Sequence, residues 1–162
     1  LPHVAARVDR FLNPEAGDNF QVNQALQAFS SGGLYGKGPG EGVVKKNIPD
    51  AHSDFIFAVI GEELGLIACI LVVALYGFIF LRGTSRLLRE DSLFVVLASA
   101  GILISFTIQA MINIASAINL IPTKGMTLPF ISYGGSSMIA ISMAMGMLLS
   151  LTRQRLGETE QL

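Results

Sequence analysis

The sequence predicts an all-α integral membrane protein in which a long extracytoplasmic loop, carrying a short amphipathic helix, precedes three transmembrane helices. Of its 162 residues, 51% are hydrophobic and 14% are charged, and the mean hydropathy is +0.57. These values lie outside the usual range of soluble domains and favour a bilayer as the surrounding solvent. Three long uncharged stretches from Leu64 onward support the same prediction.

The uncharged stretches indicate where the spans lie. The first is Leu64–Leu81, with 18 residues. After Asp91 the next charges are Lys124 and Arg153, which leaves uncharged stretches of 32 and 28 residues. Roughly 20 apolar residues cross a hydrocarbon core about 30 Å thick, so each stretch is long enough for one span. The three helices are predicted near 55–81, 93–118 and 127–151.

The positions of the cations predict the direction of the spans. The loop 82–91 carries three arginines and the tail 153–162 carries two, and cations near helix ends mark the cytoplasmic side. Three lysines near the opposite helix ends weaken this count without reversing it. We therefore expect a cytoplasmic tail at 153–162, a membrane region at 55–152, and an extracytoplasmic loop at 1–54. The turn around Pro122–Pro129 then shares the outer surface with that loop.

The outer loop contains one helical pattern and one segment that no helix can hold. Apolar side chains recur on one face up to Ser31, as in a helix that lies at a membrane interface. The segment GGLYGKGPGEG then supplies six glycines in eleven residues and must be a loop. Lys37 lies within it, but Gly38 follows where a phosphate-binding loop needs Ser or Thr. We expect a flexible loop that adapts to a bulky substrate or partner.

Composition excludes several classes of function. A net charge of −1 gives no reason to expect a nucleic-acid partner, and the sequence lacks the basic stripe that such binding requires. The single Cys69 allows neither a disulfide within the chain nor a cysteine-based metal site. The chain begins at Leu1 without a targeting segment, so we expect it to be the C-terminal part of a longer protein.

Ionisable residues flank the start of the first span. His52 and Asp54 immediately precede it, and Glu62 lies about two turns further in. Such residues are costly next to hydrocarbon and are often functional, so all three are candidate site residues. Asp54 and Glu62 are eight positions apart, about 80° around a helix, which lets them line one cavity. Two readings of Asp54 stay open, as a catalytic carboxylate or as a cap on the helix N-terminus.

The second span carries a polar stripe. Ser105, Gln109 and Asn113 recur every four residues, and further polar residues continue along the same face. The ordinary use of such side chains is hydrogen bonding between membrane helices, which we favour over contact with a substrate.

Lys124 is the only charge between Asp91 and Arg153. It lies in IPTKGMTLPFISYGGSS, whose prolines and glycines predict a shaped turn that lines protein or a cavity. One interpretation has the Lys124 ammonium reaching the lipid headgroups. The sharper interpretation is phosphate binding by this ammonium together with nearby hydroxyls and helix-terminal amides. The candidate substrate-binding hydroxyls are those of Thr123, Ser136 and Ser137.

The blocks IPDAHSDFIFAVIGEELGLI and IPTKGMTLPFISYGGSS resemble the SEDS family (shape, elongation, division and sporulation), and most closely its cell-division branch. NPEAGDNFQVNQALQAFSSGGLYGKGPGEG is also similar to the family's large outer loop. The resemblance implies the last three helices of a ten-helix bundle in the bacterial cytoplasmic membrane, at the division septum. It implies that Asp54 is the essential loop aspartate, with Ser53 where threonine is usual, and that Lys124 is the lysine of the Pro-Thr-Lys-Gly block.

The resemblance also implies an activity, that of a peptidoglycan glycosyltransferase that polymerises lipid II into glycan strands. The implied partners are lipid II and the growing strand, a class B penicillin-binding transpeptidase and other division proteins. We expect Asp54 to act as a general base or to bind a divalent cation, Mg²⁺ or Mn²⁺, and we expect no organic cofactor. Two alternatives remain open: a lipid II flippase that makes no bond, and a noncatalytic membrane scaffold for the transpeptidase.

Overall fold

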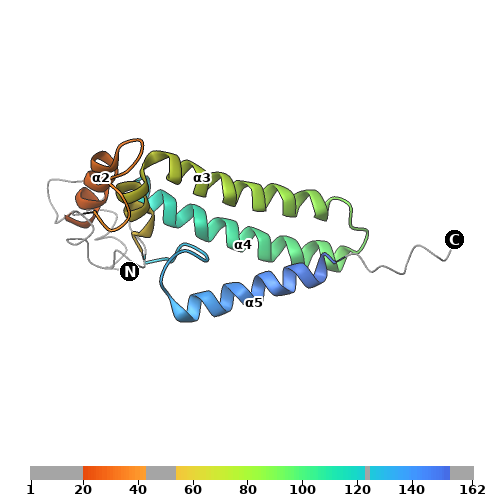
Figure 1. The fold of residues 1–162 in the computed structure, drawn as a ribbon. Coiled ribbons are helices and arrows are strands. Elements are labelled where there is room, and N and C mark those ends of the chain that lie inside the picture. Colours follow the sequence, from red (N-terminus) through yellow and green to blue (C-terminus); the bar gives the residue numbers. More distant parts are fainter. Residues whose placement is uncertain (1–19, 43–53, 123–124, 154–162) are drawn as a thin grey trace.

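The computed structural model describes residues 20–42, 54–122 and 125–153, and these residues form four helices. In Figure 1, α3, α4 and α5 run alongside one another, and α2 covers the end where α3 begins. α4 lies between its neighbours, because it contacts both α3 and α5. The helices are α2 (Phe20–Gly32), α3 (Ile56–Leu87), α4 (Leu93–Ala117) and α5 (Gly135–Leu151).

Two of the helices, α3 and α4, are long and apolar enough to cross a membrane. In the most apolar stretch of each, only 17% and 22% of the residues are buried within the chain. The core helix of a soluble protein would be mostly covered, so these exposed apolar faces fit a lipid or helical environment. α5 is also apolar, but its 17 residues make it shorter than the third span expected from the sequence.

Two helix bounds differ from the sequence prediction. α3 continues to Leu87 rather than ending near 81, because the charged residues beyond the apolar stretch still form a regular helix. α5 begins at Gly135 rather than near 127. Pro129 has no N–H for a helical hydrogen bond and Phe130 has a φ of 63°, so the chain before Gly135 forms a turn instead.

Buried apolar side chains hold the two ends of the helices together. Beside α2, Ala25 and Ala28 are fully buried against Ala58 and neighbouring residues of α3. The apolar face of α2 therefore covers the first turns of α3. At the far end, Leu87, Leu103 and Leu148 join α3, α4 and α5.

A break in α3 divides it into a short first segment and a long second one. Gly65 has φ 80° and ψ −176°, values outside the helical region. In a continuous helix the N–H groups of residues 66 and 67 would donate to the carbonyls of 62 and 63. In the structure, these N–H and carbonyl groups bond instead to the backbone of loop residues 33–38, which we call the glycine clasp. Leu66 and Ile67 donate to the carbonyls of Gly33 and Leu34 (3.0 and 3.4 Å), and the Glu62 and Glu63 carbonyls accept from Lys37 and Gly38 (3.0 and 2.9 Å).

This exchange satisfies four backbone groups that the break removes from the helix, and buried backbone groups without partners are costly. It requires the two backbones to approach closely. A β-carbon at Gly36 would overlap the Glu63 carbonyl, and one at Gly65 would overlap Gly36 and Leu34. The close approach of the two backbones therefore requires glycine both at position 36 of the clasp and at position 65 of the break.

Gly65→Ala should destabilise the full-length protein, whereas Gly77→Ala should not. Alanine at 65 must adopt a positive φ, at a cost of about 1–3 kcal/mol before the overlap is counted. A β-carbon at Gly77, in the helical part of α3, meets nothing within 4 Å. The apparent melting temperature in detergent measures the difference, and equal values for the two variants would contradict the proposed role of the clasp.

Candidate functional site

The candidate site lies at one end of the helices. Figure 1 shows α2, the start of α3, the end of α4 and the connection to α5 at this end, with the α3–α4 loop and the end of α5 at the other. Within the described residues, the segments predicted to face outside thus lie together, and the arginine-bearing loop 82–91 lies at the opposite end.

Asp54 is half-buried just before α3 and faces the turn that leads to α5. A β-carbon added at Gly125 would lie 3.0 Å from Asp54 Oδ2 and 3.8 Å from its Cγ. The N-cap position of α3 belongs to Phe55, and no side-chain hydrogen bond caps this end. The Asp54 carboxylate is therefore placed beside the backbone of Gly125, the residue that follows Lys124 in the chain.

The amide of Asn113 joins the two segments that meet at Asp54. Its Nδ2 donates to the Asp54 backbone carbonyl, at 3.0 Å, and also to the Met126 carbonyl. Asn113 is fully buried near the end of α4. One side chain thus connects the residue before α3 to the turn before α5.

Further side chains hold residues 125–134, which we call the site turn. Gln109 Nε2 donates to the Thr127 carbonyl at 3.0 Å, and the hydroxyls of Thr127 and Ser137 lie 2.7 Å apart. The Tyr76 hydroxyl donates to the Pro129 carbonyl. The Ser132 hydroxyl accepts from the Leu128 N–H at 2.7 Å. Irregular backbone is tolerated among apolar helices only where such partners exist, so α3 and α4 determine the shape of this turn.

The polar stripe of α4 was expected to form hydrogen bonds between membrane helices, but two of its side chains bond to segments outside the helices. Gln109 and Asn113 bond to the site turn and to the residue before α3, in place of a side chain on a neighbouring helix. Their spacing of four residues places them on one face of α4, one turn apart.

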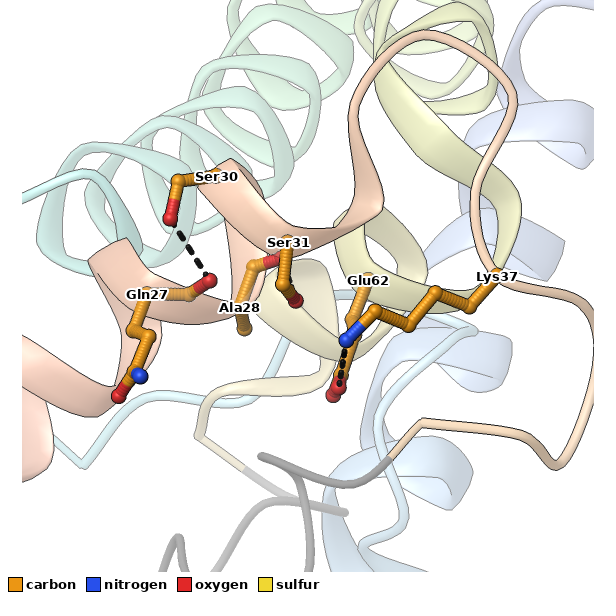
Figure 2. Close-up of polar contacts among 6 residues, drawn as sticks. All are labelled: Gln27, Ala28, Ser30, Ser31, Lys37 and Glu62. Atoms are coloured by element: carbon orange, nitrogen blue, oxygen red, sulfur yellow. Dashed lines mark hydrogen bonds and ion pairs between the residues drawn. The ribbon is translucent and has the colours of Figure 1, made fainter.

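Glu62 lies in the short first segment of α3 and is fully buried. Its Oε1 lies 3.9 Å from Nζ of Lys37, which reaches across from the glycine clasp, as Figure 2 shows. The sequence predicted that Glu62 and Asp54 line one cavity. The structure places Glu62 beside Lys37 of the clasp and Asp54 beside Gly125 of the site turn. A cavity shared by the two carboxylates, and a role for Glu62 in binding a substrate, stay predictions.

The structure describes some of the other predicted site residues but not all of them. His52, Thr123 and Lys124 lie outside the described residues. Ser136 is exposed in the first turn of α5, and Ser137 is adjacent to Thr127. Their roles in binding a substrate stay predictions. Sequence reasoning did not assign the turn-holding role to Tyr76, Gln109 or Asn113, although the stripe on α4 was a signal for two of them.

A metal site stays a prediction as well. Within residues 20–42, 54–122 and 125–153 no group of three or more His, Cys, Asp or Glu side chains is arranged to hold a metal ion. Asp54 is the carboxylate that the described structure places at the site turn.

Known proteins resemble the chain over nearly its whole length. A family model for a cell cycle protein, covering FtsW, RodA and SpoVE, matches residues 2–156. The probable peptidoglycan glycosyltransferase FtsW of Caulobacter vibrioides is 49% identical, with 96% of this chain and 40% of that protein covered. The protein of the same name in Escherichia coli is 42% identical, with coverages of 93% and 38%. The chain thus spans about two fifths of the length of these relatives.

Two solved structures have a similar fold. One is a chain from a structure described as showing the structural coordination of polymerization and crosslinking by a peptidoglycan synthase complex. It has a TM-score of 0.72 at 28% identity, with 97% of this chain and 44% of that chain covered. The other is a mutant of the rod shape determining protein RodA of Thermus thermophilus. Its TM-score is 0.62 at 32% identity, with coverages of 82% and 40%.

The ion pair between Lys37 of the clasp and Glu62 of α3 predicts how substitutions at these residues change the melting temperature. Lys37→Met leaves the buried Glu62 carboxylate without its ammonium, so it should lower the melting temperature of the full-length protein. Glu62→Gln in the same chain removes the buried charge and should restore part of the loss, because a buried carboxylate that has lost the Lys37 ammonium costs more than a neutral amide. A double variant that loses as much as the two single variants combined would show that the residues are not coupled.

Proposed function

Because the chain belongs to the family of cell cycle proteins that contains FtsW, RodA and SpoVE, we propose that it forms part of a peptidoglycan glycosyltransferase that polymerises lipid II. The observation that carries the proposal is the position of the Asp54 carboxylate beside Gly125. Asp54 and Lys124, the two candidate residues of opposite charge, are 70 positions apart in the sequence, and this contact brings their segments together.

The proposed setting is the bacterial cytoplasmic membrane, at the division septum. In this proposal α3, α4 and α5 belong to the last three of ten spans, with the site end outside the cell and the arginine-bearing end inside. The exposed apolar faces of α3 and α4 support a multi-pass arrangement in which lipid and further helices cover them.

The proposed chemistry uses Asp54 as a general base. The carboxylate removes the proton from the 4-hydroxyl of the acceptor sugar, and the hydroxyl oxygen attacks the anomeric carbon of the donor glycan. The bond from that carbon to the lipid pyrophosphate breaks as the glycosidic bond forms, and the pyrophosphate leaves with the electron pair. General-base assistance of this kind contributes typically about 10²- to 10⁴-fold to the rate.

The negative charge that develops on the pyrophosphate requires a positive partner. Lys124, with Thr123, Ser136 and Ser137 nearby in the sequence, is proposed to bind this group. A divalent cation, Mg²⁺ or Mn²⁺, would supply the same charge stabilisation. Mg²⁺ is commonly bound by one or two carboxylates together with substrate phosphates. Asp54 fits that donor set, and in that case it would serve as the cation ligand instead of the base.

The proposed partner is a class B penicillin-binding transpeptidase, together with other membrane proteins of cell division. The similarity to a peptidoglycan synthase complex that couples polymerization and crosslinking supports this pairing. Crosslinking of the strands would then follow their synthesis at the same outer surface.

Asp54→Asn in the full-length protein should reduce polymerisation of purified lipid II by at least about 10²-fold, because the amide cannot accept the proton. Asp91→Asn is the matched control, since Asp91 is an exposed aspartate at the opposite end of the helices. Gel analysis of labelled glycan strands gives the rate, and the melting temperature confirms that both variants are folded.

The same assay separates the proposal from the two alternatives. Undiminished strand synthesis by Asp54→Asn would remove this carboxylate from the chemistry. Transfer of lipid II between leaflets by the wild-type protein, with no strands formed, would favour a flippase. Strands that form only through the transpeptidase complex, and equally with Asp54→Asn, would favour a scaffold.

A further inference from the structure

Asn113 combines complete burial with contacts to both halves of the site. Its Nδ2 donates to the carbonyls of Asp54 and Met126, which lie 59 and 13 positions away in the sequence. Both neighbours are acceptors only, so the amide must present its NH₂ group to them and not its oxygen. The orientation of this side chain is therefore determined by the two segments that it connects.

The Asp54 carbonyl lies just outside the helical hydrogen-bond pattern. The N–H groups of Ala58 and Val59 both donate to the carbonyl of Phe55. The first regular acceptor of α3 is thus Phe55, and Asn113 donates to the residue before it. This contact acts directly on the residue that carries the candidate carboxylate.

The environment of the Asn113 Oδ1 atom indicates why asparagine occupies this position. Its Oδ1 is buried and has no hydrogen-bond partner within the described part of the chain. A buried acceptor without a partner is destabilising, so the side chain is not optimised for stability alone. Two N–H donors on one short, rigid side chain are what the Asp54 and Met126 carbonyls require, and Asn supplies both.

We propose that Asn113 is a positioning residue that aligns Asp54 with the site turn for glycosyl transfer. The inference rests on the proposed function for its catalytic part, whereas the alignment itself is a structural claim that can be tested separately. Gln109, one turn earlier on α4, bonds only to the turn, at Thr127. Asn113 differs because it bonds to both sides of the site.

The structural claim is tested by crosslinking in the full-length protein, with Asp54→Cys and Gly125→Cys in a Cys69→Ala background. Asp54 Cγ, near where a cysteine sulfur would lie, is 3.8 Å from a β-carbon at Gly125, so a small side-chain adjustment brings the two thiols together. We expect rapid oxidation in this chain and several-fold slower oxidation once Asn113→Leu is added. Leucine keeps the shape of asparagine but has no donor. Asn113→Ser, which keeps one donor, should fall between the two.

Ser99→Ala is the matched control for the crosslinking. Ser99 is also fully buried on α4, and its hydroxyl has no partner within the described residues. Its removal should leave the crosslinking rate unchanged, because Ser99 lies about 21 Å along α4 from Asn113, at 1.5 Å per residue. Equal oxidation rates in the Asn113→Leu and Ser99→Ala chains would overturn the proposed alignment.

The catalytic claim is tested with Asp54 intact. Asn113→Leu should lower kcat for lipid II polymerisation roughly 10- to 100-fold, because a base displaced by about 1 Å is poorly placed for proton transfer. KM should change by less than about twofold, since the loss falls on the transition state. Asn113→Ser should retain more activity than Asn113→Leu, and Ser99→Ala should match the wild type.

The outcomes distinguish failure of the inference from failure of the proposed function. An active wild-type protein whose kcat is unaffected by Asn113→Leu, or in which only KM rises, contradicts a positioning role. A wild-type protein that forms no strands contradicts the proposed function, and the crosslinking rates still decide the alignment. If Asn113→Leu does not fold, the milder Asn113→Ser provides both comparisons.

Discussion

Backbone groups that leave a helix in an apolar environment must find other partners, and this constraint organises the site end of the molecule. It applies first at Gly65, where the glycine clasp supplies hydrogen bonds to both sides of the break in α3. It applies again at the site turn, whose carbonyls accept from Tyr76, Gln109 and Asn113. The irregular segments are thereby held in one arrangement, although they contain several glycines.

The two sets of contacts act on the same short segment, residues 54–64. The clasp and α2 hold its far end and one face, through Glu62 and the alanines of α2. Asn113 holds its start, at Asp54. A carboxylate whose backbone is held from both directions stays close to the site turn, which is the condition that the proposed general-base role requires.

The sequence was informative about the helices and much less so about what connects them. Uncharged stretches predict membrane helices because the cost of burying charge is large and local in sequence. The break at Gly65 escaped prediction because apolar residues lie on both sides of it, interrupted only by Glu62 and Glu63, and its partners lie about 30 positions earlier. For the same reason the clasp was expected to be a flexible loop. Asp54 and the residues around Lys124 were recognisable as motifs, but the bond from Asn113 to both segments is visible only in three dimensions.

The central claim is that Asp54 and the site turn share one outward-facing surface. Asp54→Cys and Gly125→Cys, introduced singly into the full-length protein without Cys69, can be labelled in intact cells with a thiol reagent that does not cross membranes. The account predicts that both are labelled from outside, whereas Asp91→Cys is labelled only after the membrane is permeabilised. Labelling of positions 54 and 125 from opposite sides of the membrane would contradict the account, because no single site can then contain both.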